Sequence, residues 1–169
     1  MIKGGKGGAN TNLTGLAFEK KHSLEDALKR AGFEVEKFVV SKDGKILGEL
    51  AGQYRLYKFL TARDVDWSER ISKRLKPDEA LYSIKSKKLT IVEKKFQNVS
   101  GSVDEKLQTS AFKLKQYRKL VEGLGIEVQY VYLLSDYFSS PRYQDVLDYI
   151  KESGADYHFE SLPLELLDL

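Results

Sequence analysis

Residues 76–96, KPDEALYSIKSKKLTIVEKKF, predict a β-hairpin with charged side chains near its open end. The first strand is expected at 79–85 and the second at 89–96, because both segments contain β-branched and apolar residues and the polar residues 86–88 between them suit a turn. Asp78 opens the first strand, and Glu93 follows it after fourteen residues. The hairpin is therefore expected to bring both acids onto one small sheet.

The second strand of this hairpin has an unusual distribution of charge. Side chains alternate between the two faces of a strand. One face is expected to carry an apolar row that ends in Glu93 and Lys95, and the other to carry Thr90, Val92, Lys94 and Phe96. Charges beside buried apolar neighbours are costly unless they are paired or bind a metal ion. A divalent cation is one explanation for this placement.

The residue types suit magnesium. This ion prefers carboxylate oxygens, keeps several waters, and is usually held by one or two protein carboxylates together with a substrate phosphate. Asp78 and Glu93 are the candidate ligands, and the Lys95 ammonium is placed to orient a metal-bound water. The alternative is a Glu-Lys pair on a solvated strand face, since such short patterns are common in charged sequences.

The hairpin resembles the PD-(D/E)XK nuclease superfamily, whose best-known members are restriction endonucleases. The resemblance rests on Pro77-Asp78 and on Glu93-Lys94-Lys95. It extends over residues 13–153, where the order helix, strand, two acid-carrying strands, helix, strand, helix can be followed. The implied fold is mixed α/β (α+β mixed), a restriction-endonuclease-like central mixed sheet flanked by helices.

The resemblance also implies roles for individual residues. Asp78 and Glu93 would be metal ligands, the Lys94 backbone carbonyl a possible extra ligand, and Lys95 the catalytic lysine that positions water. Glu19 in the first helix would orient a metal-bound water. The implied cofactor is Mg²⁺, for which Mn²⁺ can substitute.

Composition limits the class of protein. A chain of 169 residues with 41% apolar and 31% charged residues suits one soluble domain. It has no cysteine, which excludes disulfides, zinc-thiolate sites and cysteine nucleophiles. No apolar run reaches membrane-spanning length, and MIKGGKGG lacks the apolar stretch of a signal peptide, so a cytoplasmic protein is expected.

The rest of the chain predicts a simple series of elements. Residues 1–12 are expected to form a flexible arm, and residues 13–169 a single nuclease domain with an insertion at about 41–76. The other expected elements are a helix over 13–31 ended by Gly32, a strand over 33–40, a turn at 42–45, a helix over 103–124 with a Ser102/Glu105 capping box, a strand over 127–134, a helix over 141–151, and an apolar tail at 157–169 that docks on the core or on a second subunit.

Polar and basic residues outside the hairpin are candidates for DNA contacts. The insertion offers Gln53, Arg55, Lys58 and Arg63, and the helix over 103–124 offers Lys106 and Lys113 on a polar face. The alternative for each is an ordinary solvated or half-buried position, since scattered arginines and exposed lysine faces are common.

The resemblance implies a magnesium-dependent endodeoxyribonuclease that hydrolyses double-stranded DNA at a specific sequence and leaves 5′-phosphate ends, as a type II restriction endonuclease does. A small domain with one site implies a homodimer, because two-fold symmetric DNA is matched by a two-fold symmetric protein. The alternatives are a structure-specific repair or recombination nuclease such as a Holliday-junction resolvase, and a non-catalytic DNA-binding module of the same fold.

Overall fold

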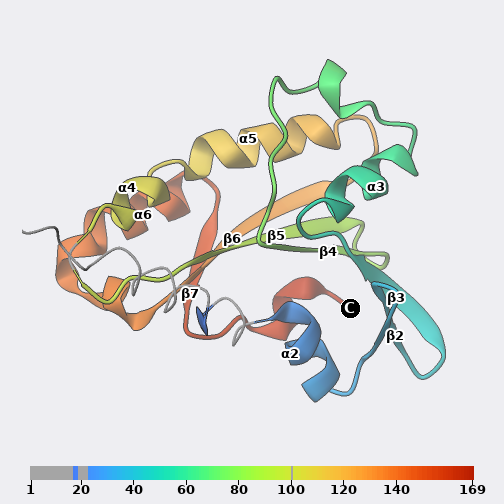
Figure 1. Ribbon diagram of the computed structural model, residues 1–169, viewed down its shortest axis with the longest axis horizontal. Helices are drawn as coiled ribbons and strands as arrows, with labels where there is room; N and C mark the ends of the chain where they lie inside the picture. The colour runs from blue at the N-terminus through green and yellow to red at the C-terminus, as the bar shows by residue number, and fades with distance from the viewer. Residues whose placement is uncertain (1–16, 19–22, 100) are drawn as a thin grey trace, which may run out of the picture.

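A mixed sheet of seven strands runs through the molecule in a computed structural model that describes residues 17–18, 23–99 and 101–169 (Figure 1). The strands lie side by side in sequence order, and helices cover both faces, which confirms the expected fold class. The strands are β1 (Glu34–Glu36), β2 (Val39–Lys42), β3 (Lys45–Leu50), β4 (Glu79–Ser83), β5 (Lys88–Lys95), β6 (Glu127–Leu134) and β7 (Asp156–Phe159). The helices are α2 (Leu24–Arg30), α3 (Arg55–Thr61), α4 (Val103–Leu107), α5 (Ser110–Leu120) and α6 (Gln144–Glu152). Short 3-10 helices are η1 (Trp67–Glu69), η2 (Asp136–Ser139), η3 (Pro141–Tyr143) and η4 (Leu164–Leu167).

The hairpin predicted from residues 76–96 is formed by β4 and β5. The two strands are antiparallel, with Glu79 opposite Val92 and Ser83 opposite Lys88. The turn between them uses Lys87 at a positive φ of 51°. Next to the hairpin, β6 runs parallel to β5, because α4 and α5 carry the chain back along the sheet before β6 begins.

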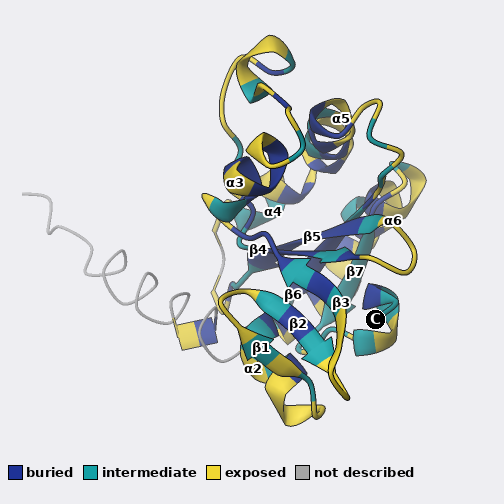
Figure 2. Ribbon diagram, turned by 90° about the vertical axis from the view of Figure 1, so that its right-hand side faces the viewer, coloured by how far each residue is buried: buried dark blue, intermediate teal, exposed yellow. Residues whose placement is uncertain are grey.

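The two faces of the sheet contact different helices. On one face, Leu89 and Ile91 of β5 pack in the core that contains buried residues of α3, α5 and α6. On the other face, Val92 packs with Phe18 and Leu133, and a further apolar cluster there contains buried residues of α2 and η4. The predicted alternation of side chains along the second strand is therefore confirmed. Figure 2 shows this burial concentrated in the central strands.

Two predicted helices are interrupted. Ser23 has extended backbone, and its side chain accepts a hydrogen bond from the Asp26 N–H as the N-cap of α2, so the predicted helix over 13–31 breaks there. The predicted helix over 103–124 is divided at Gln108 and Thr109 into α4 and α5. The Ser102 side chain makes no capping hydrogen bond, so the predicted capping box is wrong.

The first predicted strand is also wrong in extent and position. Residues 33–40 form parts of β1 and β2, and a tight turn at Lys37 and Phe38 separates them, with φ values of 47° and 72°. The strand next to the acid-carrying hairpin is instead β3, which pairs with both β2 and β4. The segment at about 41–76 thus supplies a strand inside the sheet, together with α3 and η1.

The C-terminal tail docks on the core of its own chain. Leu167 of η4 is buried in the same apolar cluster as Leu81 of β4. The Ser83 hydroxyl donates to the Asp168 carbonyl at 2.7 Å, and Lys88 forms an ion pair with the Asp168 carboxylate. Docking on the core, one of the two possibilities expected for the tail, is confirmed.

Two predictions lie outside the described residues, namely the flexible arm over 1–12 and the role of Glu19. No helix in the described ranges combines the length and the apolar character that crossing a membrane requires.

Candidate active site

Asp78 stands immediately before β4 and is held there by backbone contacts on both sides. The Gln53 N–H donates to the Pro77 carbonyl at 2.9 Å, and the Ala51 N–H donates to the Ala80 carbonyl at 2.8 Å, so the chain after β3 continues alongside this segment. On the other side, the Lys94 N–H donates to Asp78 Oδ2 at 2.8 Å. The Asp78 carboxylate therefore lies over the last residues of β5.

Glu93 and Lys95 lie on one face of β5 and meet Asp78 there. Lys95 Nζ is 3.1 Å from Glu93 Oε2 and 3.5 Å from Asp78 Oδ2. It also donates to the Lys94 carbonyl at 2.9 Å. The structure therefore brings together, at Lys95, the three side chains predicted to form the catalytic group.

The cluster is largely shielded from solvent. The Glu93 side chain is 6% exposed and that of Lys95 is 16% exposed. Burial by itself lowers the pKa of Lys95, but the charges of Glu93 and Asp78 outweigh this effect, and the pKa is raised above its usual value. Lys95 therefore carries a full positive charge at neutral pH.

Lys113 of α5 joins this cluster. Its Nζ lies 3.2 Å from Glu93 Oε2, the same oxygen that Lys95 contacts. The sequence predicted Lys113 on a polar face of the helix over 103–124. Residues four apart lie on the same side of a helix, so the spacing to the buried Tyr117 is the signal that this interpretation missed.

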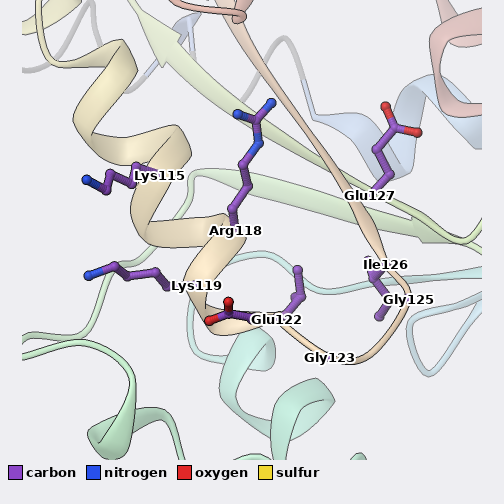
Figure 3. A pocket seen from close by; sticks show the side chains of 9 residues that line it. Lys115, Arg118, Lys119, Glu122, Gly123, Gly125, Ile126 and Glu127 are labelled. Carbon is purple, nitrogen blue, oxygen red and sulfur yellow. The ribbon is translucent and has the colours of Figure 1, made fainter.

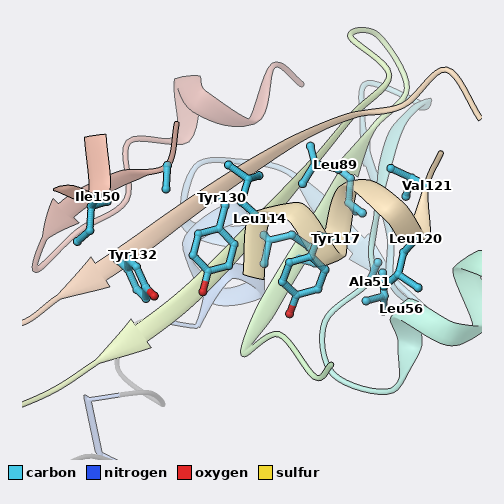
Figure 4. Packing of buried hydrophobic residues seen from close by; sticks show 14 of the residues in the cluster. Ala51, Leu56, Leu89, Leu114, Tyr117, Leu120, Val121, Tyr130, Tyr132 and Ile150 are labelled. Carbon is cyan, nitrogen blue, oxygen red and sulfur yellow. The ribbon is translucent and has the colours of Figure 1, made fainter. Parts of the chain in front are cut away.

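Three tyrosines line the cluster on the α5 side of the sheet. The rings of Tyr117 and Tyr130 stack at 5.9 Å between centroids, and Tyr130 meets Tyr132 edge to face at 5.2 Å (Figure 4). Burial, reinforced by the nearby Glu93 charge, raises the pKa of Tyr117 and of Tyr130, so both hydroxyls remain protonated. The sequence did not indicate Tyr130 and Tyr132 as part of the site, because alternating tyrosines on a strand also suit ordinary core packing.

The oxygens present fit a hard divalent cation. Asp78, Glu93 and the Lys94 carbonyl supply oxygen donors within one cluster. Among the described residues, Asp78 Oδ1 and Glu93 Oε1 accept no hydrogen bond, so each carboxylate has a free oxygen. The buried Tyr130 hydroxyl, which lies beside that of Tyr132, has no well-formed hydrogen bond within the described ranges. The described residues contain no group of three or more histidines and acids that could by itself hold a metal ion.

A family comparison agrees with this geometry. The family model of the PD-(D/E)XK nuclease superfamily domain matches residues 11–152. The chain belongs to this superfamily. No significant match was found among curated proteins or among solved structures. Membership indicates a nuclease, in a superfamily whose members typically use divalent metal ions.

The opposite face of β5 in this superfamily member carries a second charged pair. Lys94 Nζ lies 2.8 Å from Glu79 Oε1, and the Lys94 side chain is almost fully buried. The same Glu79 oxygen accepts a hydrogen bond from the Leu24 N–H at the start of α2. Lys94 and Glu79 thus connect the hairpin to α2, and the alternation along β5 keeps their side chains away from the cluster of Asp78, Glu93 and Lys95.

The candidate DNA-contact residues have different surroundings. Gln53 is exposed beside Pro77, and Lys58 is exposed on α3. The Arg55 guanidinium lies 3.2 Å from the centroid of the Phe38 ring. Arg63, which follows α3, pairs with Glu49 of β3 at 3.2 Å and stacks on Phe59 of α3, which gives it a packing role between these two elements. Lys106 is exposed on α4.

A hollow of about 540 Å³ lies elsewhere in the nuclease domain. It lies between the C-terminal part of α5 and the start of β6, and Lys115, Arg118 and Lys119 line it (Figure 3). Glu127 at its rim is opposite Lys88, at the far end of β5 from Lys95. This hollow is therefore separate from the carboxylate cluster.

Proposed function

We propose that the protein is a magnesium-dependent endodeoxyribonuclease that hydrolyses phosphodiester bonds of double-stranded DNA and leaves 5′-phosphate ends. The observation that carries the proposal is the contact of Asp78, Glu93 and Lys95 at the end of β5. A protein that only binds DNA does not need two carboxylates and a shielded ammonium at one point of its sheet.

The reaction is a displacement at phosphorus. A divalent cation held by Asp78, Glu93 and the Lys94 carbonyl would lower the pKa of a bound water and neutralise charge on the phosphate. The water oxygen forms a bond to phosphorus while the bond from phosphorus to O3′ breaks. The water proton passes to solvent, and O3′ takes a proton from solvent, which leaves a 3′-hydroxyl and a 5′-phosphate. Mn²⁺ is expected to substitute for Mg²⁺, since its ligand preferences are similar.

Lys95 has two tasks in this scheme. Its ammonium donates to the Lys94 carbonyl, which fixes the direction of the side chain. The remaining N–H groups face the Glu93 and Asp78 carboxylates, so they are placed to orient the attacking water and to stabilise charge on a phosphate oxygen. A charged Lys95 donates hydrogen bonds and does not accept a proton.

The DNA strand is expected to pass over the residues between β3 and α3. Gln53 has a φ of 54°, a strained value for a non-glycine residue, and its N–H is bonded to the Pro77 carbonyl. The next residue, Tyr54, is exposed, with the Lys76 ammonium 4.1 Å from its ring centroid. An aromatic ring and a cation beside Asp78 suit a base and a phosphate of the bound strand. Arg55, Lys58 and Lys106 are the other proposed contacts.

The narrower proposal is a homodimeric type II restriction endonuclease. Its support is the family membership together with the cluster of Asp78, Glu93 and Lys95 in the described part of the chain, since cutting both strands at a two-fold symmetric site with this cluster takes two copies.

Digestion of phage genomic DNA tests both levels of the proposal. Wild type and Glu93→Ala are compared on a gel with magnesium and with a chelator. Discrete bands from wild type with magnesium alone are expected. A smear would contradict sequence-specific cleavage and favour a structure-specific nuclease, which would then be tested on branched DNA. Absence of cleavage on linear and branched DNA would overturn the nuclease proposal in favour of a binding module.

A further inference from the structure

The Glu93 carboxylate is shared by two ammonium groups through one oxygen. Lys95 Nζ lies 3.1 Å and Lys113 Nζ 3.2 Å from Glu93 Oε2, and they come from different elements, β5 and α5. Two like charges converging on one shielded oxygen repel each other, and the arrangement is stable only while Glu93 keeps its full negative charge available to both.

The formal charges in this cluster cancel. Asp78 and Glu93 contribute two negative charges, and Lys95 and Lys113 contribute two positive charges. A divalent cation at Glu93 adds two positive charges to a site that is already neutral. Its entry therefore has to displace an ammonium from Glu93 or bring an anion with it, because unbalanced charge in a shielded site is costly.

Lys113 is the ammonium that is free to leave. Lys95 has further partners in Asp78 and the Lys94 carbonyl. Lys113 has Glu93 as its one ion-pair or hydrogen-bond partner among the described side chains, and it is more exposed, at 27% against 16% for Lys95. Its flexible side chain can turn from α5 toward solvent without breaking another contact.

We propose that Lys113 occupies Glu93 until DNA arrives, and then moves to a non-bridging oxygen of the substrate phosphate while the metal takes its place at Glu93. This inference rests on the proposed function. Lys113 thereby becomes a catalytic residue, since it contacts the substrate phosphate, and it also makes metal binding and DNA binding favour each other. The coupling is reciprocal, because a ligand that raises the affinity for a second ligand is itself bound more tightly in its presence.

Calorimetric titration with Mn²⁺ in the absence of DNA gives a readout that does not depend on cleavage. The proteins compared are wild type, Lys113→Met, and Lys115→Met, which removes the same charge from an exposed position of the same helix. Lys113→Met is expected to bind Mn²⁺ about tenfold more tightly than wild type, within the usual range of coupling between two ligands. Lys115→Met is expected to match wild type.

A second titration uses Ca²⁺ and a duplex with phosphorothioate linkages that resists cleavage. The duplex is expected to tighten Ca²⁺ binding by about tenfold in wild type and by much less in Lys113→Met. Lys113→Gln, which keeps a polar side chain, serves as the second variant if the methionine variant does not fold, as judged by thermal unfolding.

Three results would overturn parts of this account. Equal Mn²⁺ affinity in wild type and Lys113→Met would overturn the competition at Glu93 and leave the proposed function intact. Tighter Mn²⁺ binding in both Lys113→Met and Lys115→Met would mean that the loss of any positive charge on α5 strengthens binding, and that Lys113 does not compete specifically for Glu93. If wild type shows no saturable Mn²⁺ binding, or if the binding is unchanged in Asp78→Ala, the metal site is overturned. The proposed function and this inference then fail together.

Discussion

Lys95 combines a shielded position with a full positive charge. Its pKa is raised because Glu93 and Asp78 outweigh the effect of burial. The charge is thus maintained by the two residues proposed to hold the metal, and the three side chains act as a unit. Substitutions within such a unit are expected to have effects that do not add.

Lys95→Met is expected to reduce cleavage by about 100-fold or more while leaving DNA affinity nearly unchanged, because the lost hydrogen bonds act on charge that develops during the reaction. Single-turnover cleavage and equilibrium binding of a labelled duplex with Ca²⁺ measure the two quantities. A parallel loss of affinity and cleavage would show that Lys95 binds ground-state DNA instead.

Tyr54 is 57% exposed and lies next in sequence to Gln53, which contacts Pro77. If its ring stacks on a base, Tyr54→Ala should weaken DNA binding by about 1–3 kcal/mol, and Tyr54→Phe should retain most of the affinity. Fluorescence of 2-aminopurine placed near the cleavage position reports the stacking. Tyr149→Ala removes another exposed tyrosine, from α6, and should have no effect. Equal weakening by both alanine variants would exclude a specific stack.

At the scale of elements, the close approach of β3 and β4 controls where Asp78 lies. A Cβ atom at Gly48 would lie 2.3 Å from the Tyr82 carbonyl oxygen, so a larger residue forces the two strands apart. Gly52, further along, packs against the backbone of Asp78, Glu79 and Ala80. Small residues at these two positions let the strand pair form and fix the start of β4.

Gly48→Ala is expected to lower the free energy of unfolding by about 1–3 kcal/mol, the usual cost of overpacking. Urea unfolding measures it. Gly101→Ala is the matched control, because its Cβ would meet no atom nearer than 3.6 Å. Similar stability of the two variants would mean that β3 and β4 separate without cost.

The η4 segment is attached to the hairpin through Asp168. A hydrogen bond and the charge of Lys88 lower the pKa of the Asp168 carboxyl. Because the folded-state pKa lies below the unfolded value, the carboxylate stabilises the fold above the unfolded pKa, and this contribution is lost as the pH falls through the folded pKa.

Asp168→Asn should therefore be less stable than wild type at pH 7, and the difference should vanish at a pH below both pKa values. Urea unfolding across this range gives the comparison. A difference that persists unchanged in acid would indicate that the asparagine perturbs packing and that the charge is not responsible.

At the scale of the whole molecule, the proposed function assigns one cut to each cluster of Asp78, Glu93 and Lys95. In the proposed homodimer each protomer cuts one strand, so mixed dimers of wild type and Glu93→Ala should nick supercoiled plasmid and leave it open-circular. Wild-type dimers should linearise it. Gel analysis after co-refolding the two chains separates these products, and linear DNA from mixed dimers in a single binding event would contradict one cut per protomer.

Local patterns predicted the parts of the molecule where neighbouring residues decide the structure. The β4–β5 hairpin, its two faces and strand β6 are confirmed, because period-two alternation and a polar turn are properties of short segments. Gly32 and Gly154 each follow the end of a helix and have a positive φ, as expected of glycines that end helices. Predictions failed where one continuous helix or strand was assumed, namely at Ser23 in the predicted helix and at Lys37 and Phe38 in the first predicted strand.

Those failures have a physical cause. Helical periodicity does not reveal a break when the residues on both sides keep the same apolar spacing, as they do around Ser23 and around Gln108. Lys37 and Phe38 are residue types that rarely adopt a positive φ, so the sequence did not indicate a turn there. The pairing of β1 with β2 on either side stabilises this turn. Arg63 was equally ambiguous, since only packing against Phe59 and Glu49 distinguishes it from a free surface arginine.

The sequence by itself determined the hairpin and the identity of the carboxylates and lysine on it, because alternation and spacing are local properties. The fold class followed from the resemblance of these residues to the PD-(D/E)XK superfamily. Only the tertiary structure decided that Lys113 reaches Glu93, that β3 lies beside the hairpin, and that three tyrosines lie near the cluster on one face of the sheet. These contacts join residues far apart in the chain. They depend on how α5 and β6 pack against β5, and no short segment encodes that packing.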